Sequence, residues 1–238
     1  MSEQLVFFDI PGRDGKSWSL NPWKIRLALN YKNIDYKTEW LEYPDIEPTF
    51  KSFGLEGDQE QIRPYTCPTA KFPDGTYIMN SKFIVKRLEK DYPEPPLHLD
   101  SELTQESLDL ASRLFDSLHA VLLPLIPRHI LGDRSAEYFW RTRKEVFQMS
   151  LDELEEKKGG EAAWEAAKQP IADAEALLNK TEGPFFLGDK VSYADFLFVS
   201  FLFFVKRLNE EHYQRIAKQA PTAERLYRAC EQWIDESK

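Results

Sequence analysis

The chain is poor in cysteine, has no excess of positive charge and contains no long hydrophobic run. Only Cys67 and Cys230 occur among its 238 residues, which is too few for a disulfide framework and favours a reducing compartment. The net charge of −9 argues against nucleic acid or an anionic membrane as a partner, because either requires a clustered basic surface. The longest apolar run, Phe196 to Val205, is interrupted by Ser200 and is about half the roughly 20 residues that span a bilayer. With no signal-peptide pattern at the N-terminus, we expect a cytoplasmic globular protein.

Several common kinds of site are also missing. The four histidines are too scattered to suggest a metal site, and neither a glycine-rich phosphate loop nor a Ser-His-Asp arrangement is recognisable. We therefore expect no metal cofactor. The histidines are His98, His119, His129 and His212.

The hydrophobic pattern changes near residue 93, which predicts two domains. Residues 1–92 alternate between strand-like and helix-like patterns, whereas residues 101–238 have helical periodicity almost throughout. Between them, residues 93–100 include three prolines, which favour an extended linker. We expect an α/β domain, a linker and an all-helical domain with these boundaries.

The first domain is predicted to contain a βαβ unit followed by a ββα unit. A Pro-Asp-Gly turn at 73–75 between two extended runs is typical of a hairpin. Residues 44–64 lack a clean period and are predicted as a loop with at most one short helix. The predicted elements are strands at 5–8, 36–43, 66–72 and 76–79, and helices at 22–32 and 80–91.

The second domain is predicted to consist of helices alone. A long helix begins at Ser101 and is interrupted by Pro124 and Pro127. Ser192 and Asp195 form an acidic version of a capping box, which marks the start of a buried helix. The remaining predicted helices cover roughly 135–157, 161–180, 192–207 and 222–236.

Ser19 and Asn21 lie where the first predicted helix begins, after a short strand and a loop. Asn21 has the side chain of a helix N-cap, and Pro22 is typical of the first helical position. Such a helix start presents free N–H groups and the positive end of the helix dipole, which stabilise an anion. The segment therefore predicts a place to hold and activate a thiolate.

Three motifs in this order resemble those of the glutathione transferase superfamily. They are Trp18 to Leu29, Tyr65-Thr66-Cys67-Pro68, and Gly188 to Asp195, and together the motifs and topology cover nearly the whole chain. The resemblance implies a thioredoxin-like N-terminal domain, an all-helical C-terminal domain, glutathione as co-substrate and a homodimer.

A closer resemblance is to the fungal-specific class A and β-etherase-like glutathione transferases. It rests on Asn21-Pro22-Trp23-Lys24, on Asn30 to Tyr36 and on Glu42 to Pro48. It implies a serine-type enzyme that detoxifies small aromatic compounds, such as plant phenolics or lignin-derived molecules. Conjugation, ether cleavage and peroxide reduction all stay open as its reaction.

The resemblance assigns the catalytic position to Ser19, counting back from Arg26. The Ser19 hydroxyl would donate a hydrogen bond to the glutathione thiolate, because a free thiol with a pKa of about 8.5 is only partly ionised at neutral pH. The first 30 residues contain no tyrosine and both cysteines lie elsewhere, which disfavours tyrosine-type and cysteine-type mechanisms. Asn21 is a second candidate donor. The alternative that either residue only caps the helix stays open.

The resemblance also implies which residues bind glutathione. Pro68 would be cis, leaving the Cys67 backbone to pair with the cysteinyl part of the peptide. Ser81, at a helix N-terminus, would receive the γ-glutamyl carboxylate. The family usually has an acid before this serine, whereas this chain has Asn80. The structural alternatives are Cys67 as a small buried residue and Asn80 or Ser81 as an N-cap.

The second substrate would lie between the domains, against the first loop and the long helix that follows the linker. The alternative is that the residues chosen there belong to the core. A non-catalytic carrier of small aromatic molecules is the alternative function, and a scaffold protein that has lost the site is a third. The candidate pocket residues are Pro11, Gly12, Phe115, Leu118, His119 and Leu122.

Overall fold

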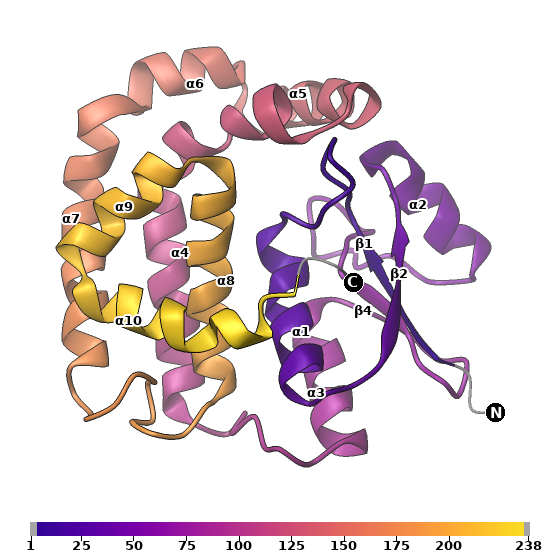
Figure 1. Cartoon of the computed structure of the whole chain (residues 1–238). Coiled ribbons are helices and arrows are strands. Elements are labelled where there is room, and N and C mark those ends of the chain that lie inside the picture. Colours follow the sequence, from indigo (N-terminus) through magenta and orange to yellow (C-terminus); the bar gives the residue numbers. More distant parts are fainter. Residues whose placement is uncertain (1–3, 236–238) are drawn as a thin grey trace.

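Four strands form one mixed sheet in the N-terminal part of the chain (Figure 1). The computed structural model describes residues 4–235, and in it the strand order is β2-β1-β3-β4. β1 and β2 are parallel, whereas β1 with β3 and β3 with β4 are antiparallel. This is the predicted βαβ-ββα arrangement of a thioredoxin-like domain. The strands are β1 (Leu5–Asp9), β2 (Tyr36–Trp40), β3 (Thr69–Lys71) and β4 (Tyr77–Met79).

Three helices accompany the sheet. α1 (Leu20–Tyr31) connects β1 to β2, and α3 (Ser81–Asp91) follows β4. Figure 1 shows α1 and α3 between the sheet and the C-terminal helices, with α2 (Tyr43–Ser52) on the opposite side. α2 is the one short helix allowed for in residues 44–64.

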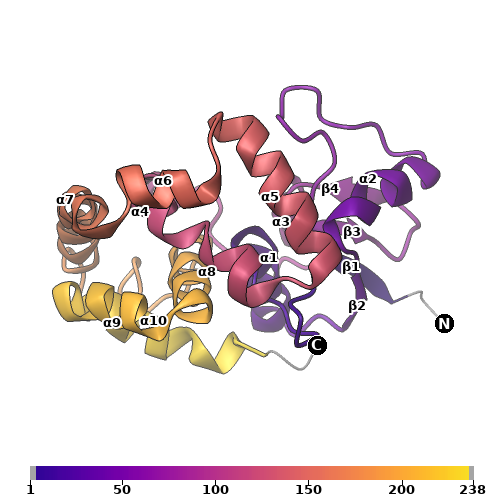
Figure 2. The same cartoon turned by 90° about the horizontal axis from the view of Figure 1, so that it is seen from above.

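The remainder of the described chain is helical, as expected (Figures 1 and 2). α8 lies at its centre and contacts α4, α1, α9 and α10. Between α4 and α5 the chain forms a π-helical turn, Ile126–Ile130, in the region where two prolines interrupt the predicted long helix. The helices are α4 (Glu102–Leu122), α5 (Asp133–Phe147), α6 (Leu151–Lys158), α7 (Gly160–Leu178), α8 (Tyr193–Leu208), α9 (Glu210–Gln219) and α10 (Pro221–Cys230), followed by a 3₁₀ turn, Glu231–Trp233.

The C-terminal helices differ from the prediction in their division. The helix predicted at 135–157 is divided, because Gln148 adopts the left-handed conformation with φ 55° and Ser150 starts α6 with a capping box. α9 was not predicted, and the Asn209 side chain caps it by accepting the His212 N–H at 3.0 Å. Within residues 4–235, no helix combines the length and the apolar composition needed to cross a membrane.

The last described residues return to α1. The Asn30 side chain donates a hydrogen bond to the Trp233 carbonyl at 2.8 Å. The Trp233 ring also packs edge-on against Tyr31, with 5.2 Å between the centroids. Trp23, which is fully buried, lies 4.1 Å from Phe203 of α8 between ring centroids. α1 is therefore covered on two sides by residues from the C-terminal part.

The predicted capping box fixes the start of α8. The buried Asp195 carboxylate accepts the Ser192 N–H at 2.6 Å and the Phe186 N–H at 2.8 Å. Burial raises the pKa of Asp195 to about 6, although these donors act in the opposite direction. The carboxylate is ionised at neutral pH and holds the turn before α8 against the helix.

We expect Asp195→Ala to lower the free energy of unfolding by about 3 kcal/mol or more, because it leaves buried N–H donors without an acceptor. Urea denaturation followed by circular dichroism measures the change. Asp189→Ala is the matched control, since Asp189 is exposed in the same turn. Equal stability of the two variants would contradict this role.

Candidate functional site

A cavity of about 490 Å³ lies where the end of the sheet meets α2, α4 and α5. It brings together all six residues predicted for catalysis and glutathione binding, from the start of α1, the turn before β3 and the start of α3. From the other side α2 contributes Tyr43, and α5 contributes Tyr138 and Arg143. The six residues are Ser19, Asn21, Cys67, Pro68, Asn80 and Ser81.

Ser19, rather than Asn21, is the N-cap of α1. The helix begins at Leu20, two residues before the expected Pro22, so the expectation of an Asn21 cap is wrong. The Ser19 carbonyl accepts the Trp23 N–H at 3.2 Å, but its hydroxyl makes no capping hydrogen bond. Ser19 is half-buried in the cavity wall, and its hydroxyl is free to donate to a ligand beside the helix N-terminus.

Asn21 lies in the first turn of α1 and is held by Lys24. The Lys24 ammonium donates to the Asn21 side-chain oxygen at 2.8 Å. This bond engages the amide oxygen, so the amide N–H groups remain as donors. Burial lowers the pKa of Lys24 to about 8, and no salt bridge joins Lys24 to any of residues 4–235. The start of α1 thus presents a hydroxyl, an amide and an ammonium group to the cavity.

The turn before β3 presents an unpaired backbone. The Cys67–Pro68 peptide bond is cis, as the resemblance implied. The Pro68 carbonyl accepts the Asn80 N–H at 3.1 Å, whereas no hydrogen bond joins the Cys67 N–H or carbonyl to another described residue. Cys67 itself is buried, and burial raises the pKa of its thiol. The backbone at this position is available, while the thiol is protonated at neutral pH.

Asn80 and Ser81 form the start of α3. Asn80 is the N-cap, since its side chain accepts the Lys82 N–H at 3.1 Å. Its φ of 78° lies in the left-handed region, which asparagine adopts more readily than most residues. Ser81 is the first helical residue and shares a side-chain hydrogen bond with Tyr193 at the start of α8. Both residues line the cavity, so their capping and binding roles are compatible.

A buried ion pair lies beneath these elements. Arg26 of α1 donates to the Asp9 carboxylate of β1 at 2.7 Å, and both side chains are fully buried. The same guanidinium donates to the Thr38 hydroxyl of β2 at 3.1 Å and to the Tyr36 hydroxyl at 3.3 Å. The pair joins both parallel strands to the helix that carries Ser19.

The residues predicted for the second substrate lie outside this cavity. Leu118 and Leu122 are fully buried in the hydrophobic core. The Phe115 ring lies 6.3 Å from that of Phe204, and the His119 ring stacks on Phe147 at 5.7 Å between centroids.

Pro11 and Gly12 belong to a loop that is fastened to the C-terminal part. Arg13 in this loop donates its N–H to the Ile130 carbonyl at 2.7 Å and its guanidinium to the Leu131 carbonyl at 2.9 Å. Asp14 forms a salt bridge with Arg207 at the end of α8. The loop is therefore fastened to α8 and the π-helical turn, and neither Pro11 nor Gly12 lines the cavity.

Two tyrosines from α2 and α5 form the aromatic wall of the cavity instead. The rings of Tyr43 and Tyr138 are stacked, 5.9 Å apart and 6° from parallel. Burial raises the pKa of Tyr43 to about 12, so its hydroxyl stays neutral. The Tyr43 N–H donates to the Ser135 hydroxyl at 3.1 Å, which fastens α2 to α5. No sequence signal marked these tyrosines, because helical periodicity alone does not tell which helices become neighbours.

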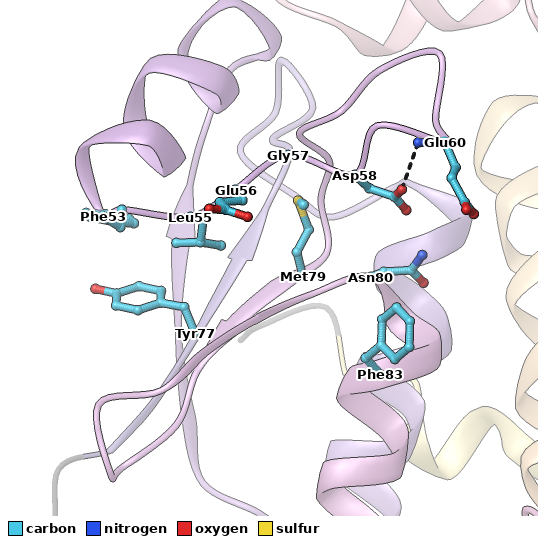
Figure 3. Close-up of a pocket in the computed structure, with 11 residues that line it drawn as sticks. Phe53, Leu55, Glu56, Gly57, Asp58, Glu60, Tyr77, Met79, Asn80 and Phe83 are labelled. Carbon is cyan, nitrogen blue, oxygen red and sulfur yellow. Dashed lines mark hydrogen bonds between the residues drawn. The ribbon is translucent and has the colours of Figure 1, made fainter.

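A second cavity of about 660 Å³ adjoins the first and shares Asp58, Met79 and Asn80 with it (Figure 3). The rings of Phe53 and Tyr77 are stacked on one side of it, 4.8 Å apart, and Phe83 lies on the other side, beside Asn80. Among residues 4–235, no group of three or more His, Cys, Asp or Glu side chains is arranged to hold a metal ion.

Comparison with known proteins identifies the two halves of the chain. A family model described as "Glutathione S-transferase, N-terminal domain" matches residues 18–91, and one described as "Glutathione S-transferase, C-terminal domain" matches residues 109–233. A curated relative, the glutathione S-transferase-like protein ustS of Aspergillus flavus, is 34% identical in a match that covers 97% of this chain and 91% of the relative.

Crystal structures of two fungal proteins have the same fold. A glutathione S-transferase of Ceriporiopsis subvermispora, solved in complex with glutathione, is 31% identical, with a TM-score of 0.85 over 98% of each chain. Glutathione transferase GSTFuA2 of Phanerochaete chrysosporium is 27% identical, with a TM-score of 0.84 over 99% of this chain and 100% of that one. The chain therefore belongs to the glutathione S-transferase family and resembles its fungal members.

Proposed function

We propose that this protein conjugates glutathione to small aromatic electrophiles and that Ser19 stabilises the thiolate. The observation that carries the proposal is the Ser19 hydroxyl at the N-terminus of α1, which makes no capping hydrogen bond. It lies in the same cavity as the unpaired Cys67 backbone and Ser81. Glutathione bound along Cys67 and Ser81 has its sulfur near the start of α1.

Three groups at the start of α1 favour the ionised thiol. The Ser19 hydroxyl donates a hydrogen bond to the sulfur, and the helix dipole adds a favourable potential at the same place. The Asn21 amide is a second donor, because Lys24 occupies its oxygen. The Lys24 ammonium supplies a positive charge in a partly desolvated site, where charge interactions are stronger than in water. Together they lower the thiol pKa from its ordinary value of about 8.5.

The remaining cavity suits a flat aromatic substrate. The stacked Tyr43 and Tyr138 rings offer a flat aromatic wall, and the Tyr43 hydroxyl stays neutral. With an aryl chloride as substrate, the glutathione sulfur forms a bond to the ring carbon, the carbon–chlorine bond breaks and chloride leaves with the electron pair. Plant phenolics or lignin-derived compounds as natural substrates, a role in detoxification and the homodimer stay predictions from the resemblance. A cytoplasmic location stays a prediction from the composition of the sequence.

Replacing Ser19 tests the proposed mechanism. We expect Ser19→Ala to lower the rate of conjugation to chlorodinitrobenzene about a hundredfold, because loss of the donor to the sulfur raises the thiol pKa and leaves less of the reactive thiolate. Glutathione affinity, measured by calorimetry, should change little. Ser17→Ala is the control, since Ser17 is buried two residues away and its hydroxyl has no hydrogen-bond partner.

Unchanged turnover of the Ser19→Ala protein would refute the assignment. Tight binding of phenolic compounds by the wild-type protein, without any conjugation, would instead favour the carrier function.

Lys24 gives a prediction for the pH profile. We expect the wild-type kcat/KM to fall above about pH 8, where Lys24 loses its proton and its positive charge. Lys24→Met should lower kcat/KM at neutral pH about tenfold through the lost charge, and should remove the fall at high pH. Lys16→Met, at an exposed lysine before the same helix, should keep the wild-type profile. A Lys24→Met profile identical to that of the wild type would contradict this role.

A further inference from the structure

The glutathione site of this chain lacks a negative charge at the start of α3. The γ-glutamyl group carries an ammonium as well as a carboxylate, and an ammonium taken from water needs an acceptor of opposite charge. Asn80, at the start of α3, offers only a neutral oxygen, and that oxygen already accepts the Lys82 N–H. Another residue of the cavity must supply the charge if glutathione is to bind well.

Two carboxylates line the cavity, Glu47 and Asp58. Glu47 is exposed and forms a salt bridge with Lys51 at 2.6 Å. Asp58 has no salt bridge with any residue of the described chain. Of the two, Asp58 is therefore the carboxylate that is available to a cationic group.

The loop around Asp58 fixes its position. The Asp58 N–H donates to the Pro64 carbonyl at 2.9 Å, and its carboxylate accepts the Glu60 N–H at 3.1 Å through Oδ1. Gly57 allows the two ends of the loop to meet, since a Cβ there would lie 2.6 Å from the Pro64 Cβ. One oxygen of Asp58 is thus used by the turn, and Oδ2 has no hydrogen-bond partner among the described residues.

Asp58 and Asn80 lie on facing sides of the same opening (Figure 3). Both residues line both cavities, so they flank the place where the two cavities join. Ser81 lies next to Asn80, and its hydroxyl and backbone N–H at the start of α3 suit the carboxylate of an α-amino acid. A zwitterionic α-amino acid group bound between Asp58 and the start of α3 has its carboxylate at α3 and its ammonium toward Asp58.

We propose that Asp58 binds the ammonium of the γ-glutamyl group. In this chain the loop between α2 and β3 supplies the negative charge that Asn80 lacks. The proposal rests on the proposed function in one respect, namely that glutathione occupies this cavity.

The test is calorimetric and compares two ligands. They are glutathione and glutaryl-cysteinyl-glycine, which is the same peptide without the γ-glutamyl amino group. We expect Asp58→Asn to raise the Kd of glutathione about tenfold, as for a lost charge-assisted hydrogen bond. The Kd of the glutaryl peptide should not change. Glu60→Gln removes an equal charge from the same loop and should leave both Kd values unchanged.

A second variant moves the charge back to the helix. We expect the double variant Asp58→Asn, Asn80→Asp to regain most of the wild-type affinity for glutathione, because aspartate keeps the N-cap acceptor and adds the missing charge. Binding of the glutaryl peptide shows that each variant is folded.

Three results would overturn the proposal. The first is a glutathione Kd that Asp58→Asn leaves unchanged, and the second is an equal loss of affinity for both peptides. In either case the Ser19→Ala result still stands and the proposed function survives. The third is a wild-type protein that binds neither peptide, which overturns the proposed function as well.

Discussion

The ion pair between Asp9 and Arg26 is the interaction on which the geometry of the site depends. Both groups are fully buried, so each needs the other in order to be charged inside the protein. Asp9 ends β1, Arg26 lies two turns into α1, and the guanidinium also reaches β2. A pair of this kind fixes orientation more than it adds stability, because its attraction mainly offsets the cost of desolvation. Here the ion pair fixes the orientation of α1, whose first residues face the cavity.

A second constraint comes from the C-terminal part. The capping box holds Tyr193 at the start of α8, and Tyr193 shares a hydrogen bond with Ser81 at the start of α3. The starts of α3 and α8 are thus in direct contact, while Trp23 anchors α1 on Phe203. The residues proposed to bind glutathione belong to the N-terminal part. Helices of the C-terminal part nevertheless determine the positions of α1 and α3, which carry several of these residues.

Local signals in the sequence were sufficient for most of the fold. The Pro-Asp-Gly turn predicted the hairpin, and the Ser192 and Asp195 pair predicted the start of α8, because both depend on neighbours in the chain. The start of α1 was misplaced because serine and asparagine are equally good N-caps. α9 was missed between two better-marked helices.

The site could be predicted only where the family resemblance supplied positions. Six residues far apart in the sequence meet in one cavity, but the residues chosen for the second substrate do not. Leu118 faces the core, and Tyr138 faces the cavity from α5. The periodicity of a helix indicates which face is apolar, but not whether that face meets another helix or a ligand. The role of Asp58 is also invisible in the sequence, because it depends on a loop without a regular pattern.

The contact between Trp233 and α1 has a consequence for biosynthesis. Asn30 precedes its partner Trp233 by 203 residues, and Trp233 follows the helices of the C-terminal part. Domains generally fold as units during synthesis, the N-terminal one first. In this protein α1 meets Trp233 only after the helices α4 to α10 have been synthesised, so the thioredoxin-like half reaches its native packing after the helical half has been made.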